Sequence, residues 1–473
     1  MDFIDRNEEL ARLRHLTATQ ASGLAVLYGR RRIGKSWLLV KWCQECKGIY
    51  WVADTSAPAL QRLSLAEAIS ARFPGFGEVI YPTWSSLLNA LSQRARMESW
   101  HGPVIFDEFP YLVAADHTLP GVFQAWIDAE IRDQGLLAVI SGSSQNMMQG
   151  LTLCADAPLY GRAQEVFLLK PLAAGHISRA LHLKAAVPSI QAYSVWGGVP
   201  RYWQAAEQYG NHLEQCLDEL VFHPLGVFHD EPNFLLHSET PNAIGLRPYL
   251  EVIGYGAHRI SEMGARLQQP ATALARPLSR LVELGLVQRQ VPFGEDERTS
   301  KKSLYTIGDP FCYFWFHVIA PRRSLFENAT QEARLLLWRR YAHAIFAYQW
   351  EELVRNTLHR VDRLCQSLSP NDVWLPARRW WQENYPEWDA IMANLAGDQH
   401  LLAEVKWSER PFKTADLHSL TKELLQRELP ACIRGKATAF TLVVPSVEAH
   451  VPDTINGVII LTGRDILNAT LGY

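Results

Sequence analysis

The stretch Gly29-Arg30-Arg31-Arg32-Ile33-Gly34-Lys35-Ser36 decides the fold of the first part of this chain. It follows the apolar run Leu24–Tyr28 and precedes the apolar run Trp37–Val40. Strand, glycine loop and helix, in that order, are the context in which the pattern G-x-x-x-x-G-K-[ST] holds a phosphate. The loop's N–H groups point inward, and the positive end of the helix dipole adds to them. The stretch therefore predicts a phosphate-binding loop on a parallel α/β sheet.

The residues of this loop have separate expected roles. Lys35 is expected to reach the β- and γ-phosphates of ATP, and the Ser36 hydroxyl is expected to bind Mg²⁺. Further contacts to the nucleotide are expected from Gly29, Arg32, Ile33, Gly34 and Trp37. The alternative is a chance glycine turn before a surface helix, and it leaves the two apolar flanks unexplained.

Composition and charge restrict the class of protein. The chain has 473 residues, 48% of them hydrophobic, enough for about three domains with real cores. The net charge is −3 and the isoelectric point is about 6.6, so any nucleic-acid surface must be a local patch. The cysteines are scattered, and the pair Cys43 and Cys46 has no second pair to complete a metal site.

The ends and apolar runs of the chain predict its compartment. Met1–Arg6 does not have the pattern of a signal peptide, and no apolar run approaches 18 residues. We therefore expect a cytoplasmic protein with reduced thiols and no membrane span.

A second stretch, Pro103–Glu108, reads as a buried parallel strand that ends in two carboxylates. At the carboxyl end of such a strand, side chains lie near the phosphate loop. Asp107 is expected to hold Mg²⁺ through water, and Glu108 to polarise the attacking water. An Asp-Glu pair at a strand end is common, so the upstream loop supports this interpretation.

Two later features are candidate sensors of the γ-phosphate. The strand Leu136–Ile140 ends in Ser141-Gly142-Ser143-Ser144, and we favour Ser143 over Ser141, although chain geometry alone does not choose. Arg162 follows in Leu159-Tyr160-Gly161-Arg162, and it is expected to meet the γ-phosphate of its own chain or of a neighbouring subunit. The alternatives are a plain turn and a surface arginine.

The first half of the chain resembles the archaeal-type ATPase family, an AAA+/STAND-like branch of the P-loop ATPases. The resemblance rests on Phe3-Ile4-Asp5-Arg6, on Tyr28–Arg32, on Phe106–Phe109, on Pro158–Arg162 and on Gly198-Val199-Pro200. It implies ATP binding, with Arg162 as charge sensor or finger and possible self-association through it. The expected ATPase core spans residues 1–170 and a helical lid spans 171–238. Asp5 or Asn7 is a candidate cap for the first helix.

Residues 239–310 predict a winged helix-turn-helix, since three helical segments precede a hairpin. From Gly256 to Tyr305 there are eight Lys/Arg and five Asp/Glu, a modest basic surplus of three. Arg276 and Arg280 lie one turn apart on the presumed recognition helix and are candidates for DNA phosphates. A winged helix that contacts protein is the equal alternative.

Residues 311–345 are rich in aromatics and predict a buried helix that connects to an α/β domain at 346–473. In that domain Glu404 and Lys406 stand two apart on a predicted strand and face the same side. Asp389 is expected on the neighbouring strand and Glu351 on a helix. Three carboxylates can bind Mg²⁺ or Mn²⁺, and Lys406 can orient or activate a water.

This arrangement resembles the PD-(D/E)XK nuclease fold, and the same ATPase family carries it at its C-terminus as a domain of unknown function. The matching stretches are Trp380-Trp381, Glu387-Trp388-Asp389 and Glu404-Val405-Lys406-Trp407. Trp388 and Val405 depart from the family pattern, and neither removes a ligand. The resemblance implies metal ligation by Glu351, Asp389 and Glu404, and a catalytic role for Lys406.

The sequence as a whole predicts an α/β multidomain protein: a parallel-sheet P-loop ATPase with lid, a winged helix and a restriction-endonuclease-like domain. The expected function is ATP hydrolysis coupled to metal-dependent action on DNA. The alternative is a non-catalytic, ATP-switched regulator that binds DNA or protein and uses a degenerate nuclease fold as scaffold.

Overall fold

The computed structural model describes residues 3–131, 136–152, 157–210, 212–239 and 245–471. The chain forms two compact units. The N-terminal unit is Asp5–Pro171 with Phe234–Ile244, and the C-terminal unit is Leu172–Asn233 and Gly245–Tyr473 with Met1–Ile4. Among the described residues, no helix combines the length and the apolar character needed to span a membrane.

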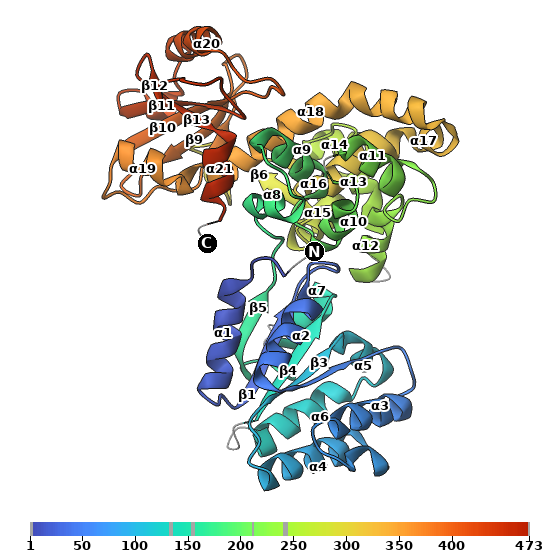
Figure 1. The fold of residues 1–473 in the computed structure, drawn as a ribbon. Coiled ribbons are helices and arrows are strands. Elements are labelled where there is room, and N and C mark those ends of the chain that lie inside the picture. Colours follow the sequence, from blue (N-terminus) through green and yellow to red (C-terminus); the bar gives the residue numbers. More distant parts are fainter. Residues whose placement is uncertain (1–2, 132–135, 153–156, 211, 240–244, 472–473) are drawn as a thin grey trace. The chain divides into compact units, whose positions relative to one another are not determined.

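A parallel five-stranded sheet forms the centre of the N-terminal unit (Figure 1). Its strands, in the spatial order β2-β3-β4-β1-β5, are β1 (Gly23–Tyr28), β2 (Ile49–Val52), β3 (Pro103–Asp107), β4 (Leu137–Gly142) and β5 (Ala163–Leu168). Every residue of β1, β3 and β4 is buried, so both faces of the sheet are covered, as the continuous apolar runs predict. All carboxyl ends meet at one edge, and β4 lies between β1 and β3.

Helices connect these strands. They are α1 (Asn7–Ala18), α2 (Lys35–Cys46), α3 (Pro58–Ser70), α4 (Trp84–Met97), α5 (Phe109–Ala115), α6 (Leu119–Trp126) and α7 (Gln145–Thr152), with a 3₁₀ turn at Phe76–Glu78 and a π-turn at Ile127–Ile131. The inner faces of α3 to α7 and one face of the sheet form an apolar core.

The C-terminal unit begins with short helices: α8 (Ile177–Ala180), α9 (Ala186–Trp196), α10 (Pro200–Glu207), α11 (Leu213–Leu217) and the π-turn Asp218–Phe222. The boundary between the two units then falls within α12 (Glu231–Glu239). A buried ion pair joins this region to the long helix α18 (Gln331–Thr357). Arg334 donates to both oxygens of Asp218 at 2.7 and 2.8 Å. Their side chains are 8% and 2% exposed, so the pair is held in one geometry.

Three helices and a hairpin follow in the predicted order. They are α13 (Arg247–Gly254), α14 (Ile260–Leu267) and α15 (Ala271–Glu283), then the antiparallel pair β6 (Val287–Gln290) and β7 (Leu304–Ile307). We call this the helix–hairpin module. Pro277 lies inside α15, which continues through it.

Residues 311–345 do not form one continuous helix, so the prediction of a single connector helix is wrong. The segment is broken into α16 (Pro310–Phe314), a π-turn (Trp315–Ile319), a 3₁₀ turn (Ala320–Arg322) and α17 (Arg323–Asn328) before α18 begins. The break falls at Pro321, which has no N–H to continue the helical ladder. The aromatic side chains of the segment are buried, as predicted.

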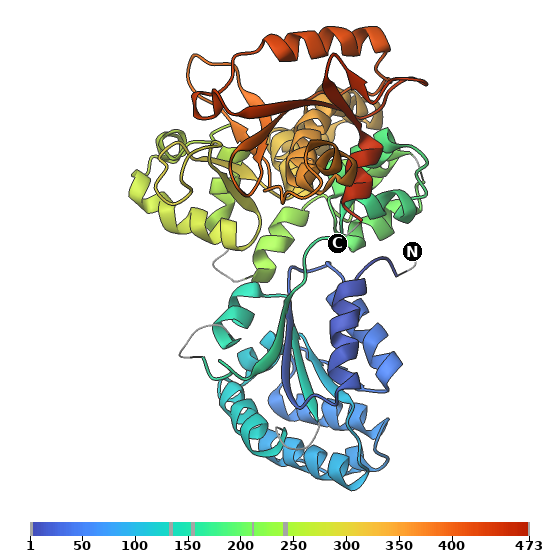
Figure 2. The same ribbon diagram turned by 90° about the vertical axis from the view of Figure 1, so that its left-hand side faces the viewer.

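A six-stranded mixed sheet ends the chain. Its strands are β8 (Arg378–Trp380), β9 (Trp388–Ala393), β10 (Gln399–Val405), β11 (Ala437–Val444), β12 (Thr454–Ile455) and β13 (Val458–Thr462). Helix α20 (Thr414–Gln426) packs on one face, as Figure 2 shows. Helix α18, with α19 (Asp362–Leu368) and α21 (Gly463–Ala469), contributes to the core on the other face.

Candidate functional site

The predicted phosphate loop joins the carboxyl end of β1 to α2, and its backbone is built for close approach. A Cβ added at Gly29 would lie 2.7 Å from the Leu169 carbonyl oxygen, so a larger residue would clash with backbone. Gly34 precedes the helix with φ 95° and Arg32 has φ 67°, both in the left-handed region. Trp37 follows on α2 with an exposed side chain. The loop thus has the tight turn that an inward-pointing N–H cradle needs.

Arg6 holds the phosphate loop in place through hydrogen bonds to backbone carbonyls. The sequence patterns did not indicate this role. Its Nη2 donates to the Ile33 carbonyl at 3.1 Å and to the Lys170 carbonyl at 2.7 Å. Its Nη1 pairs with Glu9 at 3.0 Å. Burial lowers the pKa of Arg6, although the charge of Glu9 acts to raise it. The predicted capping of α1 by Asp5 or Asn7 is wrong. The helix starts after Arg6, which has φ 70° and gives no side-chain cap, because its guanidinium binds the loop instead.

Lys35 lies at the centre of the loop. Its Nζ donates to the carbonyls of Gly29 at 2.9 Å and Arg30 at 3.0 Å, and to the Ser143 hydroxyl at 2.9 Å. The residue is 5% exposed. A buried ammonium at this point attracts phosphate oxygens strongly, because little solvent screens it.

Ser36 and Asp107 come together as predicted for a magnesium site. The Ser36 hydroxyl donates to Asp107 Oδ2 at 2.6 Å, and the Asp107 side chain is fully buried. A hydroxyl and a carboxylate oxygen are ligands that Mg²⁺ accepts, so this pair fits the ion. Tyr50, the second residue of β2, also donates to Asp107 Oδ2, at 2.7 Å. Burial and the Asp107 charge raise the Tyr50 pKa, which keeps the phenol a donor.

Ser143 links the loop to the second carboxylate. Its hydroxyl lies 2.5 Å from Glu108 Oε1 and 2.9 Å from Lys35 Nζ. Ser141 has a buried hydroxyl that contacts no polar partner among the described residues. The reason is strand order: β4 lies between β1 and β3, so the first polar residue beyond its end meets both neighbours. The geometry therefore favours Ser143 over Ser141 as the residue facing the nucleotide loop.

Arg162 lies at the opposite end of the sheet. It immediately precedes β5, whose first residue Ala163 pairs with Leu24, whereas the phosphate loop leaves β1 after Tyr28. Its guanidinium binds Asp128 at 2.7–3.1 Å. The strand length separates Arg162 from the loop of its own chain, so a contact with the γ-phosphate of that chain does not fit this position. A contact with a neighbouring subunit's nucleotide and a plain surface arginine both stay predictions.

The pair Cys43 and Cys46 lies on α2. Burial raises the pKa of each thiol to about 11, so both are protonated at neutral pH and are poor nucleophiles or metal ligands.

A second cluster of charged residues lies at the C-terminal sheet, and it contains the predicted set. Lys406 Nζ pairs with Glu404 Oε1 at 2.6 Å, since the two side chains share a face of β10. Asp389 Oδ2 accepts the Val405 N–H at 2.8 Å. Burial and the charge of Asp389 raise the pKa of Glu351 to about 7, and burial with the charge of Glu404 raises that of Asp389 to about 6.

Two arginines join this carboxylate cluster, and sequence reasoning missed both. Arg427, just after α20, donates to both oxygens of Glu404, with Nη2–Oε1 at 2.9 Å. Arg355 on α18 donates from Nε to the Asp389 carbonyl at 2.9 Å and lies 4.0 Å from Glu351. Burial alone would raise the pKa of Glu404, but Arg427 and Lys406 hold it below its usual value.

Lys406 is therefore not the only cation beside the three carboxylates. Arg427 and Arg355 also oppose their charge, although Arg355 is shared with Glu352. Within the ranges that the structure describes, no three His, Cys, Asp or Glu side chains are grouped as metal ligands.

Comparison with known proteins agrees with the geometry of the loop. Residues 3–204 match the model of an ATPase domain found predominantly in Archaea. The N-terminal part of this chain is therefore similar to archaeal-type ATPase domains. Residues 315–420 match a model of archaeal and bacterial proteins of unknown function. An uncharacterised protein of Methanocaldococcus jannaschii is 26% identical over 427 residues, 90% of this chain and 91% of that protein.

Solved structures support the fold. The Walker-type ATPase of Pyrococcus abyssi superposes with a TM-score of 0.51 at 20% identity, covering 67% of this chain and 97% of that one. The ORC2 protein of Aeropyrum pernix has a TM-score of 0.44 at 13% identity, with coverages of 72% and 95%. The first shares the fold of this chain.

Proposed function

We propose that ATP hydrolysis in the N-terminal unit controls a metal-dependent action on DNA by the C-terminal unit. The observation that supports the proposal is the Glu404–Lys406 pair on β10, beside which Asp389 of the neighbouring strand β9 accepts the Val405 N–H. Buried carboxylates with raised pKa values beside a lysine are typical of sites that bind a cation and activate water.

In the ATPase site, each residue has one role in this proposal. Lys35 neutralises the β- and γ-phosphates, Ser36 and Asp107 hold Mg²⁺, and Glu108 polarises the attacking water with Ser143 beside it. Arg162 acts on the nucleotide of a neighbouring subunit, so hydrolysis requires self-association. The free edge position of β5 and the exposed start of that strand are compatible with such a contact.

DNA contact is assigned to the helix–hairpin module, acting as a winged helix. Arg276 lies on the exposed face of α15 with Thr272 and Ser279, whereas Arg280 is half-buried and pairs with Glu283 at 3.1 Å. Hydroxyl and guanidinium groups on one exposed helix face suit phosphates and base edges.

At the carboxylate cluster, Asp389 and Glu404 are the proposed ligands of Mg²⁺ or Mn²⁺, with Glu351 direct or through water. Bound there, the ion would supply a water of lowered pKa for attack on a phosphodiester. Lys406 would orient that water. Arg427 competes with the ion for Glu404, so metal binding requires this arginine to move.

A second function is favoured by that same ion pair. With Arg427 on both oxygens of Glu404, the cluster is partly satisfied without metal, as a scaffold would need. In that case the ATPase switches a regulator that binds DNA or protein and cleaves nothing.

Manganese titration with plasmid nicking separates the two functions. The wild-type chain, Asp389→Ala, Lys406→Ala and the control Glu428→Gln, an exposed carboxylate paired with Arg434, are compared with and without ATP. Binding that requires Asp389, with nicking lost in Lys406→Ala, is the expected result. Binding without nicking, even with ATP, assigns the scaffold function. No binding at millimolar Mn²⁺ contradicts the metal site.

A further inference from the structure

A cavity of about 200 Å³ lies within the C-terminal unit, between the hairpin strand β6, helix α18 and strand β8. Four arginines line it: Arg289 from β6, Arg355 from α18, and Arg378 and Arg379 from β8. We call it the arginine cavity. Its lining acids are Glu297 and Glu352, so the wall carries more positive than negative groups.

The two acids are already engaged. Glu297 pairs with Arg378, and Glu352 pairs with Arg355 while accepting from Gln290 Nε2 at 2.8 Å. They therefore pair with two of the four arginines. Arg379 pairs with Glu387 outside the cavity, and Arg289 is the arginine of the wall whose partners among the described residues are backbone carbonyls and not carboxylates.

The other two arginines, Arg289 and Arg379, do not bond to the carboxylates of Glu297 and Glu352. Arg289 donates to the backbone carbonyls of Glu297 and Ser300. Arg379 pairs with Glu387, which does not line the cavity, and its buried Nε has no acceptor within the described part of the chain. A buried guanidinium N–H without an acceptor is costly, and an anion in the cavity would satisfy it.

The walls of the cavity are held in place. The Phe293 N–H donates to the Arg379 carbonyl at 2.9 Å, joining the segment after β6 to β8. The Phe293 ring packs on the core of the C-terminal sheet and lies edge-on to His400, at 5.9 Å between centroids. A fixed arrangement of guanidinium groups loses little entropy on binding an anion.

The cavity adjoins the carboxylate cluster through Arg355. That side chain lines the cavity while its Nε donates to the Asp389 carbonyl at 2.9 Å. Neighbouring residues of α18 therefore face the two sites, since Glu352 lines the cavity and Glu351 belongs to the cluster.

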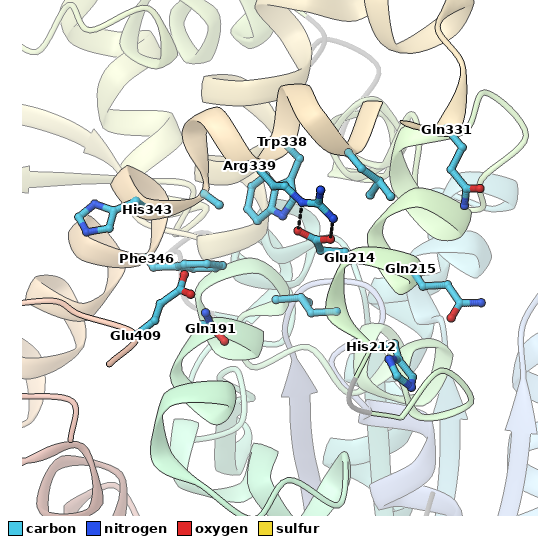
Figure 3. Close-up of a pocket in the computed structure, with 13 residues that line it drawn as sticks. Gln191, His212, Glu214, Gln215, Gln331, Trp338, Arg339, His343, Phe346 and Glu409 are labelled. Carbon is cyan, nitrogen blue, oxygen red and sulfur yellow. Dashed lines mark hydrogen bonds and ion pairs between the residues drawn. The ribbon is translucent and has the colours of Figure 1, made fainter. Parts of the chain in front are cut away.

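A second cavity of about 700 Å³, lined from α11 and α18, lacks this character (Figure 3). Its arginine, Arg339, is directed to both oxygens of Glu214, at 2.8 and 2.5 Å. This cavity is lined by one arginine, whereas four arginines line the arginine cavity.

We propose that the arginine cavity binds a phosphate of the DNA backbone and thereby presents the neighbouring phosphodiester to the carboxylate cluster. The inference rests on the proposed function, because it takes the DNA that the cluster would act on as the ligand. DNA suits the position better than a small anion or an acidic protein. The cavity is bounded by the hairpin of the basic helix–hairpin module on one side and by the cluster on the other, and a backbone can follow that path. Guanidinium forks match phosphate geometry.

The test measures binding of a fluorescent 20-base-pair duplex by anisotropy, in EDTA and without nucleotide, so that cleavage plays no part. Arg289→Gln, Arg379→Gln and the double variant are compared with Arg434→Gln, an exposed arginine on the same sheet domain that lies outside the cavity. We expect the double variant to lose roughly ten-fold in affinity and its log–log salt slope to become shallower by about one to two. The control should match wild type.

Thermal unfolding shows whether each variant folds, and exposed Arg289 gives a single variant that disturbs no buried group. An unchanged affinity and slope in the folded double variant would overturn the proposal. So would inorganic phosphate competing at micromolar concentration, which assigns a small-anion site, or an acidic polypeptide competing as well as DNA does. Asp389→Ala is expected to bind the duplex normally, so a failure of cleavage leaves this inference intact.

Discussion

Arg427 donates to both carboxylate oxygens of Glu404, a residue for which sequence reasoning predicts metal ligation. The arginine stands 23 residues further along the chain, directly after α20, and its guanidinium also lies over the Trp388 ring at 5.1 Å. A cation supplied by the protein thus takes the position that a metal ion would need.

Replacing Arg427 should therefore make the cluster a better metal site. In Arg427→Gln the Glu404 oxygens lose their fixed counter-charge, and Mn²⁺ affinity should rise roughly ten-fold, equivalent to about 1.4 kcal/mol. Isothermal titration with Mn²⁺ measures it, with Arg434→Gln as control. Weaker binding in Arg427→Gln would mean that the arginine positions Glu404 for the ion rather than competing with it.

Substitutions in the nucleotide site should separate binding from hydrolysis. Lys35→Ala should abolish ATP hydrolysis and weaken ATP binding, because the ammonium neutralises phosphate charge. Glu108→Gln should retain binding and hydrolyse poorly, because only activation of water is lost. Phosphate release and nucleotide affinity are the two measurements. Hydrolysis at the wild-type rate in Lys35→Ala would refute the assigned site.

Ser141 within β4 and Ser143 just after it provide a matched pair of substitutions. Ser143→Ala removes the hydroxyl between Lys35 and Glu108 and should lower kcat by about ten- to a hundred-fold, with ATP affinity little changed. Ser141→Ala removes a buried hydroxyl that contacts no described polar group and should leave kcat near wild type. Equal losses in both variants would show that packing at this edge, and not the Ser143 hydroxyl, supports hydrolysis.

Duplex binding by the helix–hairpin module should depend on α15. Arg276→Ala with Arg280→Ala should lower affinity for a duplex and flatten its log–log salt dependence by about one to two units. Anisotropy at several salt concentrations measures the slope. A slope identical to wild type would assign the exposed face of α15 to contacts with protein.

The free energy of unfolding should depend on pH in part through His317. Burial lowers its pKa to about 4, while the unfolded chain titrates near the ordinary value of about 6.5. The unfolded chain alone binds this proton between those values, so stability falls as pH drops from about 6.5 to about 4, by up to about 3 kcal/mol. His317→Phe, which can keep the stack on Tyr313, should flatten this fall in chemical denaturation.

The exposed His343 of α18 serves as the control, and His343→Phe should leave the slope unchanged. If His317→Phe loses stability with acid as steeply as wild type, then other groups cause the loss.

Local sequence patterns determined the elements and the centre of the nucleotide site. The loop from Gly29 to Ser36 could be predicted because its chemistry depends on consecutive backbone N–H groups and one flanking helix. Asp107, Glu404 and Lys406 could be placed because apolar runs and alternation define where a strand ends and which side chains share a face.

Strand order and long-range side-chain contacts were decided by the tertiary structure. Placing β4 between β1 and β3 brings Ser143 to both Lys35 and Glu108. Arg162 is separated from its own loop because it precedes β5, whose start pairs with the start of β1. Four side chains reach partners that are far away in the sequence. The separation is 27 residues for Arg6 and Ile33, 57 for Tyr50 and Asp107, 34 for Arg355 and Asp389, and 23 for Arg427 and Glu404. A long cationic or phenolic side chain has no periodic signal, so only the folded chain shows which backbone carbonyl or carboxylate it contacts.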